Sequence, residues 1–167
     1  MKIDTKKQPK IPYENWTIES HDTSLGEIDL AKIELYLDDA QKDGKYIEGN
    51  KLREKLKDKP VLNATVLDYL YEHQELIPDS WKGKHIFFWG TIYRSSFGDL
   101  CVRYFYFLDG SWGRLYGWLG NDWYGRNPAA VAGSTLGTKK LSPKPSDPLD
   151  GSVLEINGDR YKLSKIN

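Results

Sequence analysis

The feature that most constrains this fold is an Asp-Gly pair, residues 109–110, between two aromatic-rich runs. Asp-Gly flanked by strand-forming segments is a strong signal for a two-residue β-hairpin turn. The flanking runs, residues 99–108 and 111–119, are rich in aromatic and β-branched residues and predict two paired strands. Residues 84–94 have a similar composition and precede a turn at 95–98. The sequence therefore predicts a three-stranded antiparallel meander.

The tight turn also fixes which residues face one another. Leu108 faces Ser111, and the pairing steps outward from there. On one face Tyr106 opposes Gly113, an arrangement in which an aromatic ring shields a strand glycine. On the other face the predicted pairs are Phe107 with Trp112, Phe105 with Arg114, Arg103 with Tyr116, and Cys101 with Trp118.

The strand before this hairpin has a register that depends on the turn at 95–98. If that turn has four residues, Arg94 is paired with Asp99 across the two strands, and Phe88 is paired with Phe105. Both faces of the meander are apolar, so both need cover. Helices can cover one face, and the other must meet an N-terminal strand, the N-terminal tail, a second chain or a ligand.

Two helices are predicted before the meander. Asn50 can cap a short one, which Pro60 ends. Asn63 can cap the second, whose apolar stripe includes Val66, Leu67, Leu70 and Tyr71 and which Pro78 ends.

The alternation of apolar residues over 31–37 predicts a strand, although a helix through Leu30, Ile33 and Leu37 fits the same residues. Residues 127–131, Asn-Pro-Ala-Ala-Val, resemble a capped helical turn. The fold class that follows is α+β: a curved antiparallel β-meander packed with two or three short helices, plus a C-terminal β-hairpin.

Composition along the chain predicts four segments. Residues 1–12 are polar and broken by prolines, and we expect a flexible tail. Residues 13–132 would form the α+β domain, and residues 133–151 a Pro-rich linker. Residues 152–167 would form the C-terminal hairpin, turning at Asn-Gly and pairing Leu154 with Tyr161 and Glu155 with Arg160.

The charge balance and the single cysteine limit the class of protein. The 167 residues carry 24 Lys and Arg against 24 Asp and Glu, so the chain is not globally basic as dedicated nucleic-acid binders often are. One cysteine allows no internal disulfide, which disfavours a secreted scaffold. The N-terminus lacks the apolar stretch of a signal peptide, and no apolar run approaches membrane-helix length. We expect a cytoplasmic protein without a membrane partner.

No motif for catalysis or for metal binding is present in the sequence. The three histidines, His21, His73 and His85, lack metal-ligand spacing, and solvated or core roles fit them better. Cys101 lies mid-strand, where a buried, unreactive thiol is expected. We therefore predict no catalytic residue, no metal and no cofactor.

The candidate binding surface is the face of the predicted hairpin on which arginine alternates with aromatic residues. Stacked aromatic rings with interleaved arginine can hold bases, sugars or a peptide. The candidate residues are Arg103, Trp112, Arg114, Tyr116 and Trp118, with Trp123 and Tyr124 just beyond. The competing interpretation is a plain aromatic core. The two interpretations differ in what surrounds the two guanidinium groups. On a binding surface they reach water. In a core, Asp or Glu from elsewhere must pair with them, because an unpaired buried charge is costly.

Two stretches resemble a group of small uncharacterised bacterial proteins. These share an I-P-x-x-W/F segment followed by F-x-G-T-x-Y/W, matched here by residues 77–81 and 88–93. Tyr46, Gly49, Trp112 and Trp118 also look similar, and the resemblance spans residues 31–124. It implies one structural unit of helix and meander, and it implies no activity and no catalytic residue.

Three functional hypotheses remain, in order. The first is a non-catalytic binding or protein-interaction protein that uses the aromatic sheet face for a protein or a small ligand. The second is a nucleic-acid-associated protein that binds single strands, against which the neutral net charge weighs. The third is an enzyme with a site that the sequence does not reveal. A homo-oligomer would be one way to cover the open sheet face.

Overall fold

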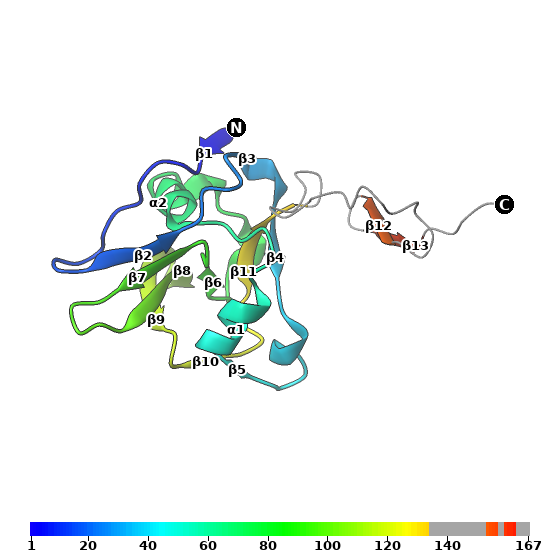
Figure 1. The fold of residues 1–167 in the computed structure, drawn as a ribbon. Helices are drawn as coiled ribbons and strands as arrows, with labels where there is room; N and C mark the ends of the chain where they lie inside the picture. The colour runs from blue at the N-terminus through cyan, green and yellow to red at the C-terminus, as the bar shows by residue number, and fades with distance from the viewer. Residues whose placement is uncertain (134–152, 157–158, 163–167) are drawn as a thin grey trace.

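The structure, a computed structural model, describes residues 1–133 and the strands at 153–156 and 159–162. As predicted, it is an α+β fold: a curled, mostly antiparallel sheet with two α-helices among these residues (Figure 1). The helices are α1 (Gly49–Lys55) and α2 (Ala64–Glu72), and 3₁₀ turns lie at Leu30–Lys32, Asp39–Gln41, Gln74–Leu76 and Asp79–Trp81. The strands are β1 (Lys2–Asp4), β2 (Thr17–His21), β3 (Glu27–Asp29), β4 (Ile33–Tyr36), β5 (Ile47–Glu48), β6 (Ile86–Phe87), β7 (Thr91–Arg94), β8 (Leu100–Leu108), β9 (Ser111–Trp118), β10 (Asp122–Trp123), β11 (Ala129–Ala132), β12 (Val153–Ile156) and β13 (Asp159–Lys162).

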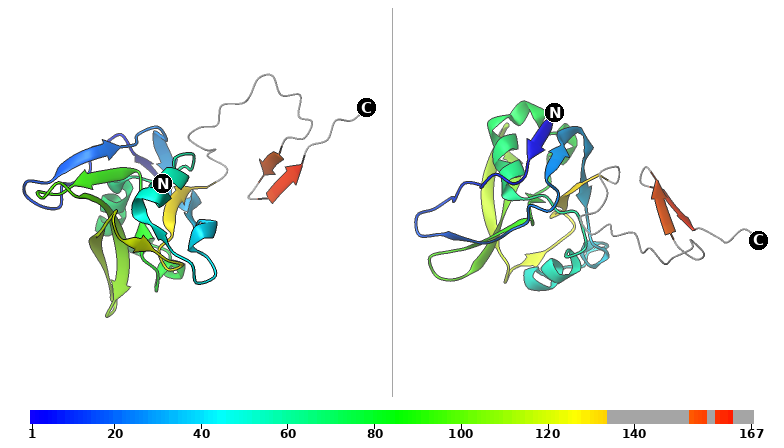
Figure 2. Two further views of the ribbon diagram at one scale, coloured as in Figure 1. Left: turned by 60° about the horizontal axis from the view of Figure 1, so that its bottom comes forward. Right: turned by 45° about the horizontal axis from the view of Figure 1, so that its top comes forward.

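The main sheet is organised around β8. Strand β9 pairs with one edge of β8 along nearly its whole length, and β7 and β6 pair in turn with the other edge. Strand β2 continues the sheet beyond β7, while β11 and β4 continue it beyond β6. The contact of β11 with β6 is parallel, and the other pairs of this sheet are antiparallel. Figures 1 and 2 show that the sheet curls around the body of the molecule.

The β8–β9 hairpin has the predicted register. All eight cross-strand pairs, from Cys101 with Trp118 to Leu108 with Ser111, are as expected from the turn. Asp109 and Gly110 both have positive φ angles, 52° and 80°, which is what a type I′ turn requires. The ring of Tyr106 lies so close to Gly113 that a Cβ there would meet it at 2.4 Å, so a larger residue would force the ring to move.

The first strand of the predicted meander is divided, and its predicted register is wrong. Arg94 faces Leu100 rather than Asp99, and Ile86 rather than Phe88 is paired with Phe105. The register differs because Ser95 still bonds across the hairpin: its amide donates to the Asp99 carbonyl at 2.8 Å, which leaves a three-residue turn, 96–98, instead of four. Between β6 and β7, Gly90 passes within 2.8 Å of the backbone at residues 62–63, measured from an ideal Cβ. That close crossing separates the two strands.

Both predicted helices form, with different boundaries: α1 ends at Lys55, before Pro60, and also begins with another cap. The Asn63 side chain caps α2 by accepting from the Thr65 amide at 3.1 Å, as expected. Helix α2 ends at Glu72, well before Pro78. Helix α1 is capped by Glu48 and not by Asn50, because the Glu48 carboxylate accepts from the amides of residues 50 and 51.

Of the strand predicted at 31–37, residues 33–36 form β4 while Leu30–Lys32 form a 3₁₀ turn, and the helical turn predicted at 127–131 is wrong. Residues Ala129–Ala132 form β11, which lies between β4 and β6. Ala129 and Ala130 are both buried. The Asn-Pro pair that signals a helix start instead leads into the strand, and the carbonyl of Pro128 accepts from the Phe87 amide at 2.9 Å.

The N-terminal segment is packed against the body, contrary to the flexible tail predicted for residues 1–12. Strand β1 pairs with β3, and Ile3 is buried in the main core. The carbonyl of Thr5 accepts from the Asn63 side chain at 2.9 Å, and the Thr65 hydroxyl donates to the Lys7 carbonyl. Prolines and polar side chains suggest disorder here, but the segment supplies backbone acceptors to the start of α2.

Each face of β8 has its own cover. Helix α2 and β1 pack with Phe105 and Trp112 on one face. Helix α1 and β10 pack on the other, around Val102 and Trp123. In Figure 1 α2 lies near the top of the molecule and α1 near its bottom.

Strands β12 and β13 pair with the predicted register, Leu154 with Tyr161 and Glu155 with Arg160. The predicted Asn-Gly turn of this hairpin, and all of the predicted linker after residue 133, lie outside the described residues. Among the helices that are described, none is long and apolar enough to cross a lipid bilayer.

Candidate functional site

The two arginines of the predicted binding face meet a carboxylate from another element. Asp68 of α2 accepts from the Arg103 Nη1 at 3.0 Å and from the Arg114 Nη1 at 2.9 Å, both at its Oδ1 atom. Arg103 is 4% exposed. This is the arrangement that the competing interpretation, an aromatic core, requires. It could not be seen in the sequence, because Asp68 lies 35 residues upstream of Arg103.

The aromatic members of that face are packed under α2 and the N-terminal segment. Trp112 is buried and makes edge contacts with Phe105 and Phe107. Tyr116 contacts Trp16 at 4.8 Å and Trp118 at 5.6 Å between ring centroids. Tyr116 and Trp118 are half-buried at the edge of this cluster.

Trp123 and Tyr124, the last two predicted residues, differ in exposure. Trp123 is 2% exposed and belongs to the core on the opposite sheet face. Tyr124 is 50% exposed and lies 5.5 Å from the ring of Tyr46. The two residues nevertheless lie together, because both line the same cavity.

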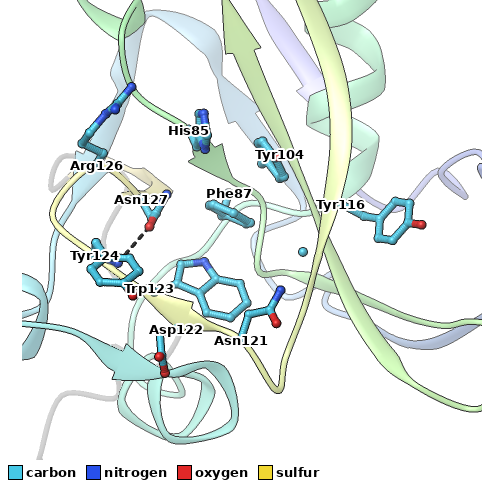
Figure 3. Close-up of a pocket in the computed structure, with 11 residues that line it drawn as sticks. His85, Phe87, Tyr104, Tyr116, Asn121, Asp122, Trp123, Tyr124, Arg126 and Asn127 are labelled. Carbon is cyan, nitrogen blue, oxygen red and sulfur yellow. Dashed lines mark hydrogen bonds between the residues drawn. The ribbon is translucent and has the colours of Figure 1, made fainter.

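That cavity lies on the face of the β8–β9 hairpin opposite the arginines, and we call it the aromatic pocket. It encloses about 410 Å³ between β6, β8, β9 and the loop that follows β10 (Figure 3). Its lining residues are His85, Phe87, Tyr104, Tyr116, Gly117, Asn121, Asp122, Trp123, Tyr124, Arg126 and Asn127. Figure 3 shows the Tyr116 ring pointing away from the cavity, so that residue contributes backbone. Pockets of 300–1,000 Å³ are typical of small-ligand sites.

Gly117 forms the floor of the aromatic pocket. It faces Val102 in the hairpin register that the Asp-Gly turn sets. A Cβ at this position would lie 3.2 Å from Phe87 and 3.3 Å from Trp123. Any larger residue here would therefore press on the two rings below the cavity and reduce its depth.

The walls of the aromatic pocket are a continuous set of ring contacts. His85 stacks on Tyr104 with centroids 4.9 Å apart and planes 26° from parallel. Phe87 contacts Tyr104 at 4.5 Å and Trp123 at 5.2 Å, the latter edge-to-face. Such contacts hold the rings in fixed orientations, so the walls are preformed.

Polar groups lie among these rings. The Trp123 Nε1 is buried and has no hydrogen-bond partner in the described part of the chain. Buried indole N–H groups normally find a partner. The Asn127 side chain accepts from the Tyr124 amide at 2.8 Å, and the Arg126 Nε donates to the Gly83 carbonyl at 3.2 Å, so the loop that bears them is braced.

The ionisation of the pocket favours a neutral interior. Desolvation by burial, and then the nearby Arg126 charge, lower the pKa of His85 below its ordinary value. Burial, and then the neighbouring Tyr106, raise the pKa of Tyr104. At neutral pH the imidazole is therefore uncharged and the phenol is protonated, and both can donate and accept hydrogen bonds.

Sequence reasoning missed His85, Phe87, Tyr104 and Gly117. A usable signal existed in the pairing of Val102 with Gly117 and of Tyr106 with Gly113, since strand glycines mark places where another group approaches closely. The arginine-bearing face attracted attention instead because Arg and Trp are common in binding sites. The side chains of the other two histidines form hydrogen bonds within the fold: His21 with the Thr91 hydroxyl and His73 with the Tyr69 carbonyl.

The described residues offer neither a metal site nor a reactive thiol. Within the described residues, no group of three or more His, Cys, Asp or Glu is placed to hold a metal ion. Cys101 is fully buried in a separate cluster with Trp16 and Tyr93. Burial, followed by the Asp99 charge, raises the pKa of its thiol to about 11.

Cys101 should therefore label slowly in the native protein. Thiol reagents attack the thiolate, and a pKa of about 11 leaves almost none of it at pH 8. We expect the rate of reaction with an aromatic disulfide reagent at pH 8 to rise by at least about 100-fold when the chain is unfolded in guanidinium chloride. Equal rates in the two states would show that the cluster around Cys101 is open.

None of the protein-family models, curated proteins or solved structures compared with this chain matches it. The resemblance of residues 31–124 to a group of bacterial proteins therefore stays a prediction.

Proposed function

We propose that this chain is a non-catalytic binding protein whose ligand is a small molecule with a planar ring, held in the aromatic pocket. The observation that carries the proposal is the cavity of about 410 Å³ with walls of stacked rings and a glycine floor. A flat ring can stack against such walls, and ring contacts of this kind are individually favourable.

The polar groups of the pocket suit a ring with a hydrogen-bonding edge. Neutral His85, the Tyr104 hydroxyl and the Asn121 amide can each donate and accept. The Trp123 indole N–H, a buried donor without a partner among the described residues, belongs to a residue of the same lining. Heteroaromatic rings, such as those of nucleobases, carry acceptors and donors on one edge and apolar faces above and below.

A sugar fits this lining less well. Among the lining residues Asp122 alone carries a carboxylate, and Figure 3 shows its side chain directed away from the cavity. The ring of a pyranose is not flat, and its hydroxyl groups point outward in several directions. A planar ligand is therefore the better match in shape and in hydrogen bonding.

Single-stranded nucleic acid is the second candidate. Its bases would stack in the same pocket, but the phosphates would need a cationic track beside it. Arg126 is the one cationic residue of the lining, because His85 is neutral. We therefore favour a free ligand. A cytoplasmic location and a bacterial origin remain part of the proposal, on the single cysteine and the motif resemblance respectively.

The test compares two glycine variants. Gly117→Ala places a methyl group on the pocket floor, within 3.3 Å of two rings, whereas a Cβ at Gly120 meets nothing within 4 Å. We expect binding of adenosine, uridine or indole, followed by calorimetry, to weaken at least tenfold in Gly117→Ala and to stay unchanged in Gly120→Ala.

Other ligands and a stability control complete the design. Methyl glucopyranoside serves as the non-planar probe and an oligodeoxythymidine as the single-strand probe. Binding of the sugar in preference to all three planar probes would contradict the ligand class, and tight binding of the oligonucleotide alone would favour the second candidate. Equal affinity of a planar probe for both variants would place its site elsewhere. Thermal unfolding of each variant checks that the fold is retained.

A further inference from the structure

The cluster of Asp68, Arg103 and Arg114 carries more positive than negative charge. One carboxylate serves two guanidinium groups, and both contacts fall on the same oxygen atom. Lys10 and Glu72 pair beside them at 2.8 Å. Counting all five groups, three cations against two carboxylates leave one positive charge in excess.

Asp68 has little capacity left to compensate that charge. Its Oδ1 accepts from both arginines, and its Oδ2 accepts from the Lys10 backbone amide at 2.8 Å. The Arg103 side chain is 5% exposed and the Arg114 side chain 25% exposed, so water screens the first of them poorly. A buried cation without full compensation is unfavourable, and the imbalance favours the entry of an anion.

A cavity lies next to these guanidinium groups, and we call it the arginine pocket. It encloses about 280 Å³ and is lined by Lys10, Ile11, Pro12, Tyr13, Arg103 and Arg114. All of its ionisable side chains other than Tyr13 are cationic. The segment that forms its rim is held in place, because the Tyr93 hydroxyl donates to the Lys10 carbonyl at 2.9 Å.

We propose that the arginine pocket binds a small oxyanion: a phosphate, sulfate or carboxylate group. A guanidinium group presents five N–H donors in a planar fork that matches the oxygen spacing of these anions. Asp68 engages one nitrogen of each fork, and an oxyanion in the cavity would accept from donors on the side away from Asp68. A single negative charge would neutralise the cluster.

This site is independent of the aromatic pocket. Residues 103 and 114 point to the face of the β8–β9 hairpin that carries α2, while Tyr104 and Gly117 belong to the opposite face. The free ligand of one site is thus not in contact with the other. Either proposal can fail without the other.

The test measures thermal unfolding in sodium phosphate, sulfate, acetate and chloride at one fixed ionic strength. Phosphate and sulfate stabilise many proteins weakly through exclusion from the surface, an effect that does not saturate. We expect an additional, saturable rise of the midpoint in the unmodified protein with at least one of the three oxyanions relative to chloride. The oxyanion that acts then identifies the source: phosphate and sulfate without acetate indicate a tetrahedral group, and acetate indicates a carboxylate.

Two arginine variants separate the site from general salt effects. Arg114→Gln should weaken the saturable effect at least tenfold in apparent affinity. Arg94→Gln, which removes a guanidinium paired with Glu19 on the exposed part of β7, should leave it unchanged. A rise of the same size in both variants, or a rise that never saturates, would overturn the proposal.

A second measurement covers the case in which Arg114→Gln does not fold. In the unmodified protein labelled with ¹⁵N, phosphate, sulfate and acetate are titrated while the Nε–H resonances of the arginines are followed. The proposal requires that at least one oxyanion shift the signals of Arg103 and Arg114 along saturable curves, with Arg94 and Arg126 unaffected. Shifts of similar size at all arginines with every anion would contradict it.

Discussion

Replacement of Asp68 by asparagine is expected to lower the free energy of unfolding by about 3–5 kcal/mol. The substitution preserves the size of the side chain and removes its charge, so two guanidinium groups lose their shared carboxylate. Arg103 is nearly inaccessible to water, which would otherwise compensate the loss. Removal of one partner from a buried ion pair is among the most costly single substitutions.

The matched control for this prediction lies one helical turn away. Glu72→Gln removes an exposed carboxylate that pairs with Lys10, and its stability should remain close to that of the unmodified protein. Chemical unfolding in chloride buffer measures both variants without added oxyanions. If Asp68→Asn and Glu72→Gln are equally stable, the arginines are hydrated and the cluster is not buried as described.

Deletion of residues 1–10 is expected to destabilise the protein by roughly 4 kcal/mol or more. The deletion removes the buried Ile3 side chain and strand β1. It also takes away the backbone carbonyl that accepts from Tyr93 and the amide that donates to Asp68. Loss of hydrogen-bond partners by buried polar groups adds to the loss of apolar burial.

Two point variants show whether the loss comes from packing. Ile3→Ala should lower the free energy of unfolding by about 2–4 kcal/mol, whereas its neighbour Lys2, which is exposed, should tolerate alanine. Thermal and urea unfolding of the three variants provides the comparison. If the truncated protein is as stable as the full chain, residues 1–10 do not contribute to the core, and the flexible tail predicted from the sequence is the better description.

The sequence predicted the parts of the fold that depend on neighbouring residues. The Asp-Gly turn set the register of eight pairs, since a type I′ turn leaves no choice of pairing. The Asn63 cap likewise depends on an amide two residues away. In both cases the interaction that decides the structure is local.

The sequence failed where distant segments meet. The break between β6 and β7 arises because Gly90 crosses residues 62–63; a glycine within residues 84–94 signals a close approach, but not which distant segment makes it. The tail was wrongly predicted because its role is to offer backbone atoms to α2, and side-chain composition says nothing of that. The same limit applies to β11, whose Asn-Pro start also suits a helix.

Sequence analysis pointed to one face of the β8–β9 hairpin, whereas the proposed aromatic pocket lies on the other. The register correctly placed Arg103 and Arg114 on one face, but their partner Asp68 lies on a helix distant in sequence. Of the seven residues proposed, Trp123 and Tyr124 line the aromatic pocket with their side chains. The aromatic pocket could be seen only when β6, β8 and the loop after β10 were brought together.

The most direct test of the proposed function is a map of ligand contacts by NMR. Adenosine, uridine and indole are titrated into ¹⁵N-labelled protein, and the backbone amides and six tryptophan indole N–H signals are followed. We expect saturable shifts with at least one of them at the Gly117 amide and at the Trp123 indole, a buried N–H that has no partner among the described residues of the free protein. Trp16 and Trp112, which lie on the opposite face, should not shift. Shifts confined to that opposite face, or no saturable shift with any of the three probes, would contradict the proposed function.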